Sequence, residues 1–170
     1  MPAVSVTASA TTIIRADPKE VLEFVLDLNR YKEVDRKFVR VGKVVGPDAD
    51  GRGSVRLWGR VKGFPPAPDR QDFVLEPWSR LTFTGAARQP GRLVFNFVGR
   101  FVCELAHDGA TRVTHSYEFT FKGPFRLVER KLTTWLQQEI EHEVTNLARA
   151  ISATNSPSTN LDMPGATGHA

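Results

Sequence analysis

The feature of this sequence that most constrains its fold is a long stretch in which apolar and polar residues alternate. The alternation runs from Phe38 to Phe121, and turn-forming residues interrupt it at short intervals. A period of two places successive side chains on opposite faces of a strand, so the stretch predicts six consecutive β-strands. Because their connections are short, neighbouring strands are expected to run antiparallel. A further alternating segment, from Val4 to Ile14, predicts an additional first strand.

A short helix is expected directly after that first strand. Asp17 can cap the helix, Pro18 fits its first turn, and Glu20 stands at the capping-box position. Apolar residues then recur at helical spacing between positions 21 and 28. The segment 29–31 predicts a turn into a second short helical segment.

A long helix is predicted at the C-terminal end. Apolar residues form one broad stripe at three- and four-residue spacing, with polar residues on the opposite face. The members of the stripe are Phe125, Val128, Leu132, Trp135, Leu136, Ile140, Val144, Leu147 and Ile151. A coiled coil is the competing interpretation. However, the apolar face of the sheet needs a cover, and no other predicted element is long enough to provide it.

These elements predict one domain of the α+β class over residues 1–153. Its curved antiparallel sheet has seven strands and wraps around the long C-terminal helix, with two short helices after the first strand. Residues 154–170 are rich in Ser, Asn, Pro, Thr and Gly and contain little to bury. We expect them to form a disordered tail.

Cysteine content and hydropathy exclude several classes of protein. Cys103 is the single cysteine, which rules out an internal disulfide and a cluster of thiolate ligands. It lies in an apolar strand pattern and is expected to be a buried structural thiol. No apolar run approaches the about 20 residues that a membrane-spanning helix needs. The first ten residues lack the features of a secretory signal, so a cytoplasmic location is expected.

The net charge of +4 raises the question of an acidic partner. Basic residues gather in two segments that acidic residues interrupt, and no nucleic-acid-binding motif accompanies them. A solvated surface is the favoured interpretation, and docking on an anionic membrane or an acidic carrier protein is the alternative. Nucleic acid is not an expected partner, and the oligomeric state stays open. The basic residues are Arg30, Lys32, Arg36, Lys37, Arg40 and Lys43, then Lys122, Arg126, Arg130 and Lys131.

The order of elements, with three local patterns, resembles the START-like (SRPBCC) superfamily and its helix-grip fold. The patterns are Ala16-Asp17-Pro18 before the first helix, Gly51-Arg52-Gly53 before the third strand, and Asp108 to Thr114 at the last hairpin. The resemblance covers roughly residues 3 to 152 and is closest to polyketide cyclase/dehydrase-like and lipid-transport-like members. One departure is Tyr31-Lys32-Glu33-Val34, where many relatives carry a Trp.

The resemblance implies a cavity between sheet and helix, and several residues are expected to line it. Gly59, Gly85 and Gly99 fall within strands, where glycine marks either a bend or the close approach of a ligand. Inward aromatic side chains would supply apolar walls. The residues expected to contact a ligand are Leu57, Gly59, Phe83, Phe95, Phe97, Phe101, His115, Tyr117, Phe119, Leu132 and Trp135.

His115 and Tyr117 are the candidate catalytic residues. They lie two positions apart on the last strand and therefore point to the same face. In a cyclase-like mechanism His115 would transfer protons while Tyr117 polarised a ketone. The alternative is that the two side chains satisfy each other or a buried water. His142 lacks the partners needed for a metal site, and neither a metal nor a cofactor is expected.

Three functions therefore remain open from the sequence. The first is binding, and possible transport, of a hydrophobic small molecule such as a lipid, isoprenoid or polyketide. The second is an aromatase/cyclase or dehydratase activity that uses His115 and Tyr117. The third is a protein-interaction or membrane-surface module. The proline-rich segment 62–68, with Phe64, is either a rigid connection or the mouth of the cavity.

Overall fold

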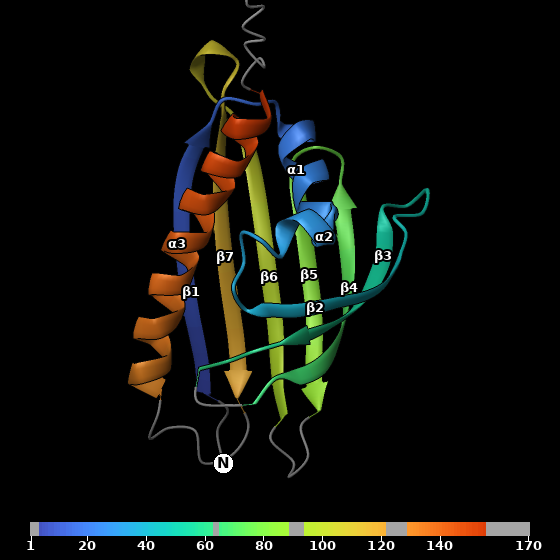
Figure 1. The fold of residues 1–170 in the computed structure, drawn as a ribbon, viewed down its shortest axis with the longest axis vertical. Helices are drawn as coiled ribbons and strands as arrows, with labels where there is room; N and C mark the ends of the chain where they lie inside the picture. The colour runs from blue at the N-terminus through green and yellow to red at the C-terminus, as the bar shows by residue number, and fades with distance from the viewer. Residues whose placement is uncertain (1–3, 63–64, 89–93, 122–128, 156–170) are drawn as a thin grey trace, which may run out of the picture.

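Seven strands form one antiparallel sheet in the order β1-β7-β6-β5-β4-β3-β2 (Figure 1). The structure is a computed structural model that describes residues 4–62, 65–88, 94–121 and 129–155. The strands are β1 (Val4–Ile14), β2 (Phe38–Val45), β3 (Arg52–Gly59), β4 (Ala67–Glu76), β5 (Arg80–Arg88), β6 (Val94–Leu105) and β7 (Thr111–Phe121). Each strand after β1 pairs with its neighbour in sequence, and β1 closes onto β7. The predicted fold class and strand number are confirmed.

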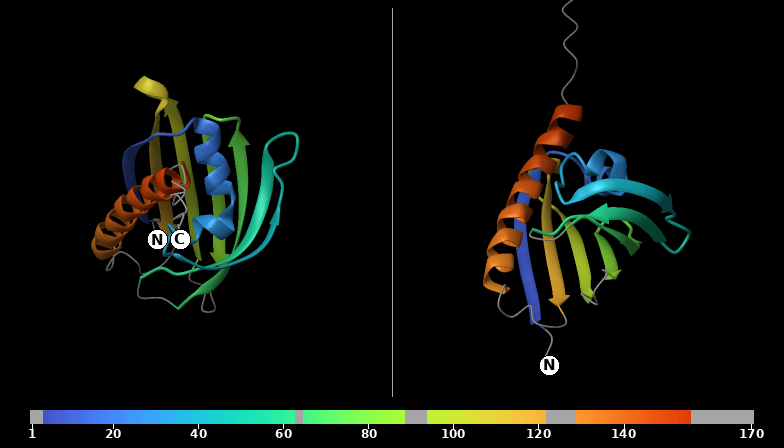
Figure 2. Two further views of the ribbon diagram at one scale, coloured as in Figure 1. Left: turned by 45° about the horizontal axis from the view of Figure 1, so that its top comes forward. Right: turned by 60° about the horizontal axis from the view of Figure 1, so that its bottom comes forward.

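The sheet bends into a half-open trough (Figure 2). Strands β2, β3 and β4 turn away from the plane of β1, β7 and β6. The pairing of β2 with β3 changes register twice, and such irregularities bend a strand and increase its twist. At Gly53 a Cβ atom would lie only 2.5 Å from the carbonyl oxygen of Val45 and would overlap the ring of Phe73. A residue without a side chain therefore lets the strands approach one another at this bend.

Two short helices follow β1 and cover the upper part of the trough. They are α1 (Pro18–Leu26) and α2 (Leu28–Tyr31). The predicted cap is confirmed, because Asp17 Oδ1 accepts a hydrogen bond of 2.8 Å from the backbone N–H of Glu20. Val21, Leu22 and Val25 of α1 are fully buried.

The long helix α3 (Glu129–Asn155) runs beside β1 at the edge of the sheet (Figures 1 and 2). Gln137 joins the two elements, since its amide donates to the carbonyl oxygen of Ser9 at 3.0 Å and accepts from the Ser9 N–H at 3.3 Å. The helix therefore covers the β1–β7 edge, while α1 and α2 cover the rest of the upper trough. No helix in the described ranges is long and apolar enough to cross a membrane.

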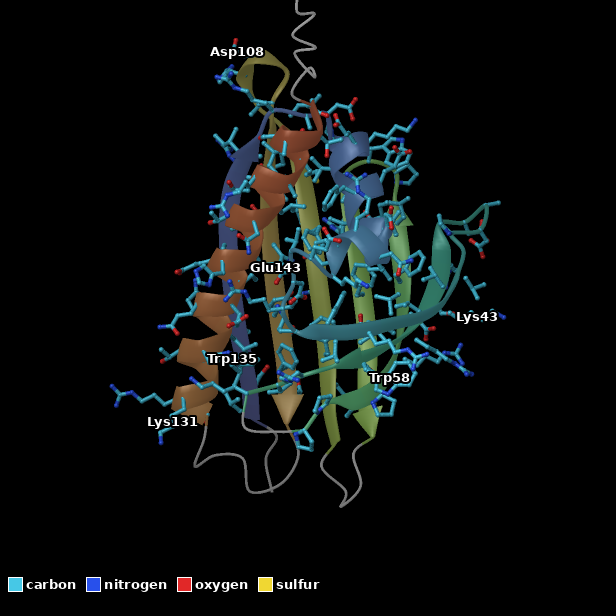
Figure 3. All side chains as sticks on the ribbon, in the orientation of Figure 1. Lys43, Trp58, Asp108, Lys131, Trp135 and Glu143 are labelled. Carbon is cyan, nitrogen blue, oxygen red and sulfur yellow. The ribbon has the colours of Figure 1, made fainter. Side chains whose placement is uncertain are left out.

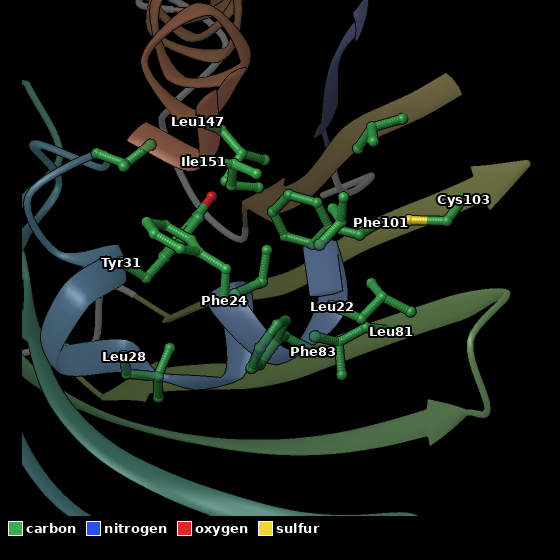
Figure 4. Packing of buried hydrophobic residues seen from close by; sticks show 14 of the residues in the cluster. Leu22, Phe24, Leu28, Tyr31, Leu81, Phe83, Phe101, Cys103, Leu147 and Ile151 are labelled. Carbon is green, nitrogen blue, oxygen red and sulfur yellow. The ribbon is translucent and has the colours of Figure 1, made fainter. Parts of the chain in front are cut away.

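The buried apolar side chains form two clusters. Figure 4 shows members of the first of them, the upper cluster. The upper cluster contains Leu22 of α1, Leu81 of β5 and Leu147 of α3, together with their neighbours. The lower cluster contains Phe119 of β7 and Leu136 of α3, together with side chains of β1. Helix α3 contributes to both clusters, and the segment between its two contributions carries the site described below.

Some sequence-based expectations fall partly or wholly outside the described residues. Phe64 in the expected mouth, and Phe125 and Val128 in the helical stripe, belong to this group. Helix α3 extends through Asn155, two residues past the expected end of the domain. The tail from residue 156 onward lies outside the described residues, so its disorder stays a prediction.

Candidate ligand-binding site

A single carboxylate interrupts the buried face of α3. Glu143 lies between Ile140 and Leu147, and only 2% of it is exposed. Every other buried residue of this helix is apolar. Figure 3 shows Glu143 on the inner side of α3, whereas Lys131 of the same helix extends away from the molecule. Glu143 is buried because it lies on the same face of the helix as the apolar residues that pack against the sheet.

Four side chains from other elements converge on this carboxylate. Lys37 lies directly before β2, and its Nζ is 2.7 Å from Glu143 Oε2. The Tyr117 hydroxyl donates to the same oxygen at 2.5 Å. The Tyr31 hydroxyl donates to Oε1, and His115 Nε2 lies 3.1 Å from Oε1. Both carboxylate oxygens are therefore fully engaged by groups from α2, β7 and the segment before β2.

Lys37 is shared between two carboxylates. Its ammonium group lies 2.7 Å from Asp35 Oδ1 as well as 2.7 Å from Glu143 Oε2. The backbone N–H of Lys37 also donates to Asp35 Oδ1 at 2.8 Å, which fixes Asp35 two residues away. The ammonium sits 4.7 Å above the ring of Tyr117, a cation–π contact. An ammonium has three N–H groups, and these two ion pairs use only two of them.

His115 is held by acceptors at both ring nitrogens. Nδ1 lies 2.9 Å from the carbonyl oxygen of Arg100, which can only accept, so Nδ1 carries a proton. Nε2 faces the carboxylate of Glu143, which already accepts from three other donors. The geometry therefore favours a doubly protonated imidazolium. With that assignment Asp35 and Glu143 balance Lys37 and His115, and the buried cluster carries no net charge.

Electrostatics in this cluster shift several pKa values. Burial alone would raise the pKa of Glu143, but the charges of Lys37 and His115 outweigh it and hold that pKa well below its usual range. Burial and the charge of Glu143 raise the pKa of Asp35 to about 6, although Lys37 opposes the shift. Burial would lower the pKa of Lys37, yet the charges of Asp35 and Glu143 raise it above its ordinary value.

The two phenols keep their protons. Burial raises the pKa of Tyr31 and of Tyr117 well above the ordinary value, and the negative charge of Glu143 raises both further. Each hydroxyl is thus a neutral donor to Glu143. Each phenol oxygen still has lone pairs that can accept a hydrogen bond from another group.

A cavity lies on the sheet side of this cluster. Its volume is about 80 Å³, and its walls come from α2, the segment before β2, and strands β2 to β7. Glu143 is absent from the lining, so its four donors stand between it and the cavity. We define the polar cluster as Tyr31, Asp35, Lys37, His115, Tyr117 and Glu143. Every member of this cluster except Glu143 lines the cavity.

Most residues expected to contact a ligand lie around this cavity. These residues are Leu57, Gly59, Phe83, Phe97, Phe101, His115, Tyr117 and Phe119. Leu132 and Trp135 lie instead in and against the lower cluster, outside the described lining. The side chain of Phe95 is outside the described residues. His115 is stacked on Phe101, with ring centroids 3.7 Å apart, and only 1% of it is exposed.

Tyr31, Asp35, Lys37 and Glu143 were not predicted as site residues from the sequence. A signal existed for Glu143, because a charged residue at that place breaks an otherwise apolar helical stripe. Tyr31, Asp35 and Lys37 lie in a short irregular segment, where no period indicates which side chains turn inward. Their proximity depends on how α2 and β2 pack against α3.

A second polar group lies on another wall of the cavity. Asp69 and Gln71 of β4 both line it, and Gln71 Nε2 donates to Asp69 Oδ2 at 2.9 Å. Strand β4 is separated from β7 by β5 and β6. Phe83 and Phe97 on these two strands therefore form an apolar wall between the two polar groups.

His142 and Cys103 lie away from the cavity. His142 is exposed on α3, and no group of potential metal ligands occurs in the part of the chain that the structure describes. Cys103 is buried in the upper cluster, where burial raises its thiol pKa to about 12. A thiol that stays protonated is unreactive, which agrees with its predicted structural role.

Solved structures share this fold at low sequence identity. TTHA0849 from Thermus thermophilus superposes with a TM-score of 0.70 at 19% identity, covering 88% of this chain and 99% of that one. The ZhuI aromatase/cyclase from Streptomyces sp. R1128 gives a TM-score of 0.63 at 14% identity, covering 89% and 93%. The di-domain ARO/CYC protein StfQ of the steffimycin biosynthetic pathway gives 0.62 at 11% identity, covering 88% of this chain and 50% of that one.

No curated protein matches the chain in sequence. The sequence model of one family, described as polyketide cyclase / dehydrase and lipid transport, matches residues 5–152. That match spans nearly the whole sheet and nearly all of α3. The chain therefore belongs to the polyketide cyclase / dehydrase and lipid transport family, within the START-like superfamily that its sequence resembles.

Proposed function

We propose that this protein binds a hydrophobic small molecule, of the lipid, isoprenoid or polyketide type, whose polar oxygen faces Lys37. The observation that carries the proposal is the polar cluster at the wall of an otherwise apolar cavity. Phe83, Phe97 and Phe119 supply apolar surface, and Lys37 supplies a cation with one N–H to spare. Such a combination of apolar walls and a few placed polar groups is typical of small-molecule sites.

Stability alone does not account for the polar cluster. Replacing a buried ion pair with apolar residues of similar volume is often neutral or stabilising, because removing charges from water is costly. A sequence selected only for packing would place an apolar side chain at Glu143, as it does at Ile140 and Leu147. Groups with strongly shifted pKa values that border a cavity are instead typical of functional sites. A protein that acts only by docking through its surface would not require this buried polar cluster.

The cluster restricts which ligand atoms it can bind. The third N–H of Lys37 is a donor and suits a carbonyl or ether oxygen. The Tyr31 and Tyr117 oxygens can accept from a ligand hydroxyl while their own O–H groups donate to Glu143. The polar end of the ligand therefore carries a carbonyl or hydroxyl group, and the remainder is apolar.

The volume of the cavity sets a further requirement. About 80 Å³ is less than the several hundred Å³ expected for an enclosed ligand site and the roughly 300–1,000 Å³ usual for drug-sized ligands. The cavity as it stands is too small for the whole of such a ligand. Binding of a whole ligand then requires rim side chains to move, and the partly or fully exposed lining residues Phe38, Arg60 and Phe97 are the ones placed to do so.

A pair of ligands in which a carbonyl group replaces one ring CH₂ group tests the proposal. Calorimetric titration with α-tetralone, a bicyclic ketone, should show binding at least about tenfold tighter than its oxygen-free parent tetralin, a difference of about 1.4 kcal/mol. The infrared carbonyl band of bound α-tetralone should move to lower frequency, because its oxygen accepts from a cation. Equal affinities together with an unshifted band would contradict the proposal.

Two variants locate the effect. Lys37→Met removes the ammonium and should abolish the preference for α-tetralone over tetralin, whereas Tyr117→Phe keeps the ammonium and should retain it. Lys32→Met is the matched control, because Lys32 is exposed earlier in the same segment and should leave both affinities unchanged. If Lys37→Met retained the ketone preference, a residue other than Lys37 would have to make the polar contact with the ligand.

A second candidate function is proton transfer on a polyketide-like ketone, as in an aromatase/cyclase or dehydratase. The observation that favours it is the Lys37 cation, which could stabilise the oxyanion of an enolate. The bonding of His115 argues for a positioning role there, because both of its nitrogens are already engaged. Tyr117 is the nearer candidate for contact with the ligand oxygen.

Isotope exchange separates this second function from simple binding. In deuterium oxide, a catalyst of enolisation accelerates exchange at the carbon beside the carbonyl of α-tetralone, and mass spectrometry follows the exchange directly. Acceleration by the wild type and not by Lys37→Met would support catalysis. Binding without any acceleration above buffer would leave the protein as a binder.

A further inference from the structure

A carboxylate oxygen on the far wall of the cavity lacks a partner. Asp69 Oδ2 accepts from Gln71, but Asp69 Oδ1 is buried and receives no hydrogen bond from any residue that the structure describes. Buried polar atoms are nearly always satisfied, and an exception calls for a physical explanation. Leaving such a group unpaired costs about 1–3 kcal/mol.

Asp69 occupies a position that the strand pattern reserves for inward side chains. Along β4, Ala67, Gln71 and Phe73 are buried and face the trough, and Asp69 falls between them at the same two-residue period. Arg70 and Asp72 point to the opposite, exposed face. The carboxylate is thus directed into the cavity by the strand itself, where an apolar side chain would ordinarily stand.

A missing side chain on the neighbouring strand makes room for this carboxylate. A Cβ atom at Gly85 of β5 would lie 3.1 and 3.4 Å from the two oxygens of Asp69 and 3.0 Å from Cγ of Gln71. Contacts of that length would force the Asp69 and Gln71 side chains to shift. Gly85 therefore gives space to the polar pair, which explains why a glycine interrupts an inward row of β5.

The charge on Asp69 is also unbalanced. Among the residues in the described ranges, none forms an ion pair with it, in contrast to Asp35 and Glu143. Burial raises the pKa of Asp69, and the hydrogen bond from the Gln71 amide lowers it only in part. The backbone N–H of Arg70 also lowers it, without meeting the geometry of a hydrogen bond to Oδ1. An exposed surface aspartate would not meet this environment, and a core position would not tolerate it without a partner.

We propose that Asp69, held by Gln71 and given space by Gly85, is a second polar subsite of the cavity that accepts a hydrogen bond from a hydroxyl group of the ligand. This inference rests on the proposed function and deepens it. The first subsite at Lys37 donates to a ligand oxygen, and the second at Asp69 accepts from a ligand hydroxyl. Phe83 and Phe97 lie between them, so the ligand is an apolar body with a carbonyl at one end and a hydroxyl at the other.

Matched ligands test the subsite. The hydroxyl and methoxy derivatives of α-tetralone, substituted para to the carbonyl, differ in whether that group can donate. The same pair on chalcone, substituted on its styryl ring, extends the test to a longer span. On at least one scaffold, the wild type should bind the hydroxyl form at least about tenfold tighter than the methoxy form, about 1.4 kcal/mol.

Two isosteric substitutions on one strand give the control. In Asp69→Asn, the amide oxygen can still accept from Gln71 while its NH₂ group turns to the cavity, so the preference for hydroxyl over methoxy should vanish or reverse. Asp72→Asn makes the same change on the exposed face of β4 and should leave the preference intact. The preference between two ligands is a readout that a purely structural role of Asp69 would not move.

The outcomes separate this inference from the proposed function. If the wild type binds α-tetralone with its ketone preference but shows no preference for hydroxyl on either scaffold, the Asp69 subsite is wrong and the proposed function stands. Persistence of a hydroxyl preference in Asp69→Asn likewise overturns the subsite. If the wild type binds none of these ligands, the proposed function fails and the subsite with it.

Discussion

The upper cluster and the polar cluster both include residues of α3, but different interactions hold them together. Leu22, Leu81 and Leu147 are fully buried among the side chains of the upper cluster. One turn before Leu147, Glu143 is equally buried but binds two phenols, an ammonium and an imidazole. The first region consists of interactions that stabilise the fold. The second consists of charges whose burial is costly and whose mutual attraction offsets that cost.

This difference locates the part of the chain that folding alone does not explain. The apolar region can tolerate many substitutions that conserve volume, because packing depends on size and shape more than on identity. The polar cluster tolerates the loss of a member poorly, since each one balances a charge or satisfies a donor. The two regions should therefore respond differently to mutation, to pH and to ligand.

Removing the shared cation should have the largest effect. Lys37→Met leaves Asp35 and Glu143 as buried carboxylates without their ammonium partner, and breaking a buried pair in this way costs about 3–5 kcal/mol. The free energy of unfolding from urea titration at neutral pH should fall by that amount. Lys32→Met should change it by less than about 0.5 kcal/mol, as is usual at exposed positions. A similarly small loss for Lys37→Met would mean that the cluster is not electrostatically coupled.

A cavity in the apolar region should have a smaller effect that pH does not alter. Leu81 is 0% exposed, and Leu81→Ala should lower the free energy of unfolding by about 3 kcal/mol, within the range of buried Leu→Ala changes. Because the titratable members of the upper cluster, Tyr31 and Cys103, have raised pKa values and keep their protons over this range, the loss should be the same at pH 5 and pH 8. The ketone preference should also survive. A pH-dependent loss would show that the two regions are not independent.

Acid titration should distinguish Asp35 from the other carboxylates. Its pKa of about 6 in the folded protein exceeds the unfolded value of about 3.9, so the native state binds more protons between these pH values. Asp35 therefore contributes a loss of stability as pH rises from 4 to 6, up to about 3 kcal/mol at about 1.4 kcal/mol per pKa unit. Glu143 has the opposite sign, because its lowered pKa stabilises the fold above about pH 4.3 and this contribution is lost only in stronger acid.

The variant Asp35→Asn isolates this behaviour. Free energies of unfolding measured at several pH values for both proteins should give a wild-type minus variant difference that falls as pH rises from 4 to 6 and is flat above that interval. Titrating groups that do not interact with Asp35 cancel in the difference, and its partners Lys37 and Glu143 stay charged throughout this interval. Asp50→Asn, at an exposed turn, serves as the matched control and should give a flat difference throughout this interval. A difference that rises between pH 4 and 6 would reverse the sign assigned to Asp35.

The fold was predictable because its determinants are local. Two-residue alternation, the cap at Asp17 and the apolar stripe of α3 each indicate their element without knowledge of the rest of the chain. For the candidate site, alternation alone indicated that His115 and Tyr117 share a face. Their hydrogen bonds to Glu143 depend on the packing of α3 against β7, and the bond of His115 to Arg100 depends on the pairing of β6 with β7.

Asp69 illustrates a limit of a different kind. Its strand pattern was visible, but an acidic residue in an inward row resembles a simple break in alternation. Only the register of β4 against β5 shows that Gly85 lies beside the polar pair and that Oδ1 remains without a partner. The candidate subsite is therefore recognised from the pairing of β4 with β5 and not from the sequence of β4 alone.

The smallest effect should come from removing one hydroxyl group of the polar cluster. Tyr117→Phe deletes the 2.5 Å hydrogen bond to Glu143 Oε2 but keeps the ring, and Lys37 still donates to the same oxygen. We expect a loss of about 1.5 kcal/mol in the free energy of unfolding, the lower end for hydrogen bonds to charged groups. The thermal unfolding midpoint should fall by only a few degrees, while the ketone preference supplied by Lys37 persists. If this variant instead loses as much stability as Lys37→Met, the phenol rather than the ammonium is the main partner of Glu143, and the ligand subsite would have to be reassigned to Tyr117.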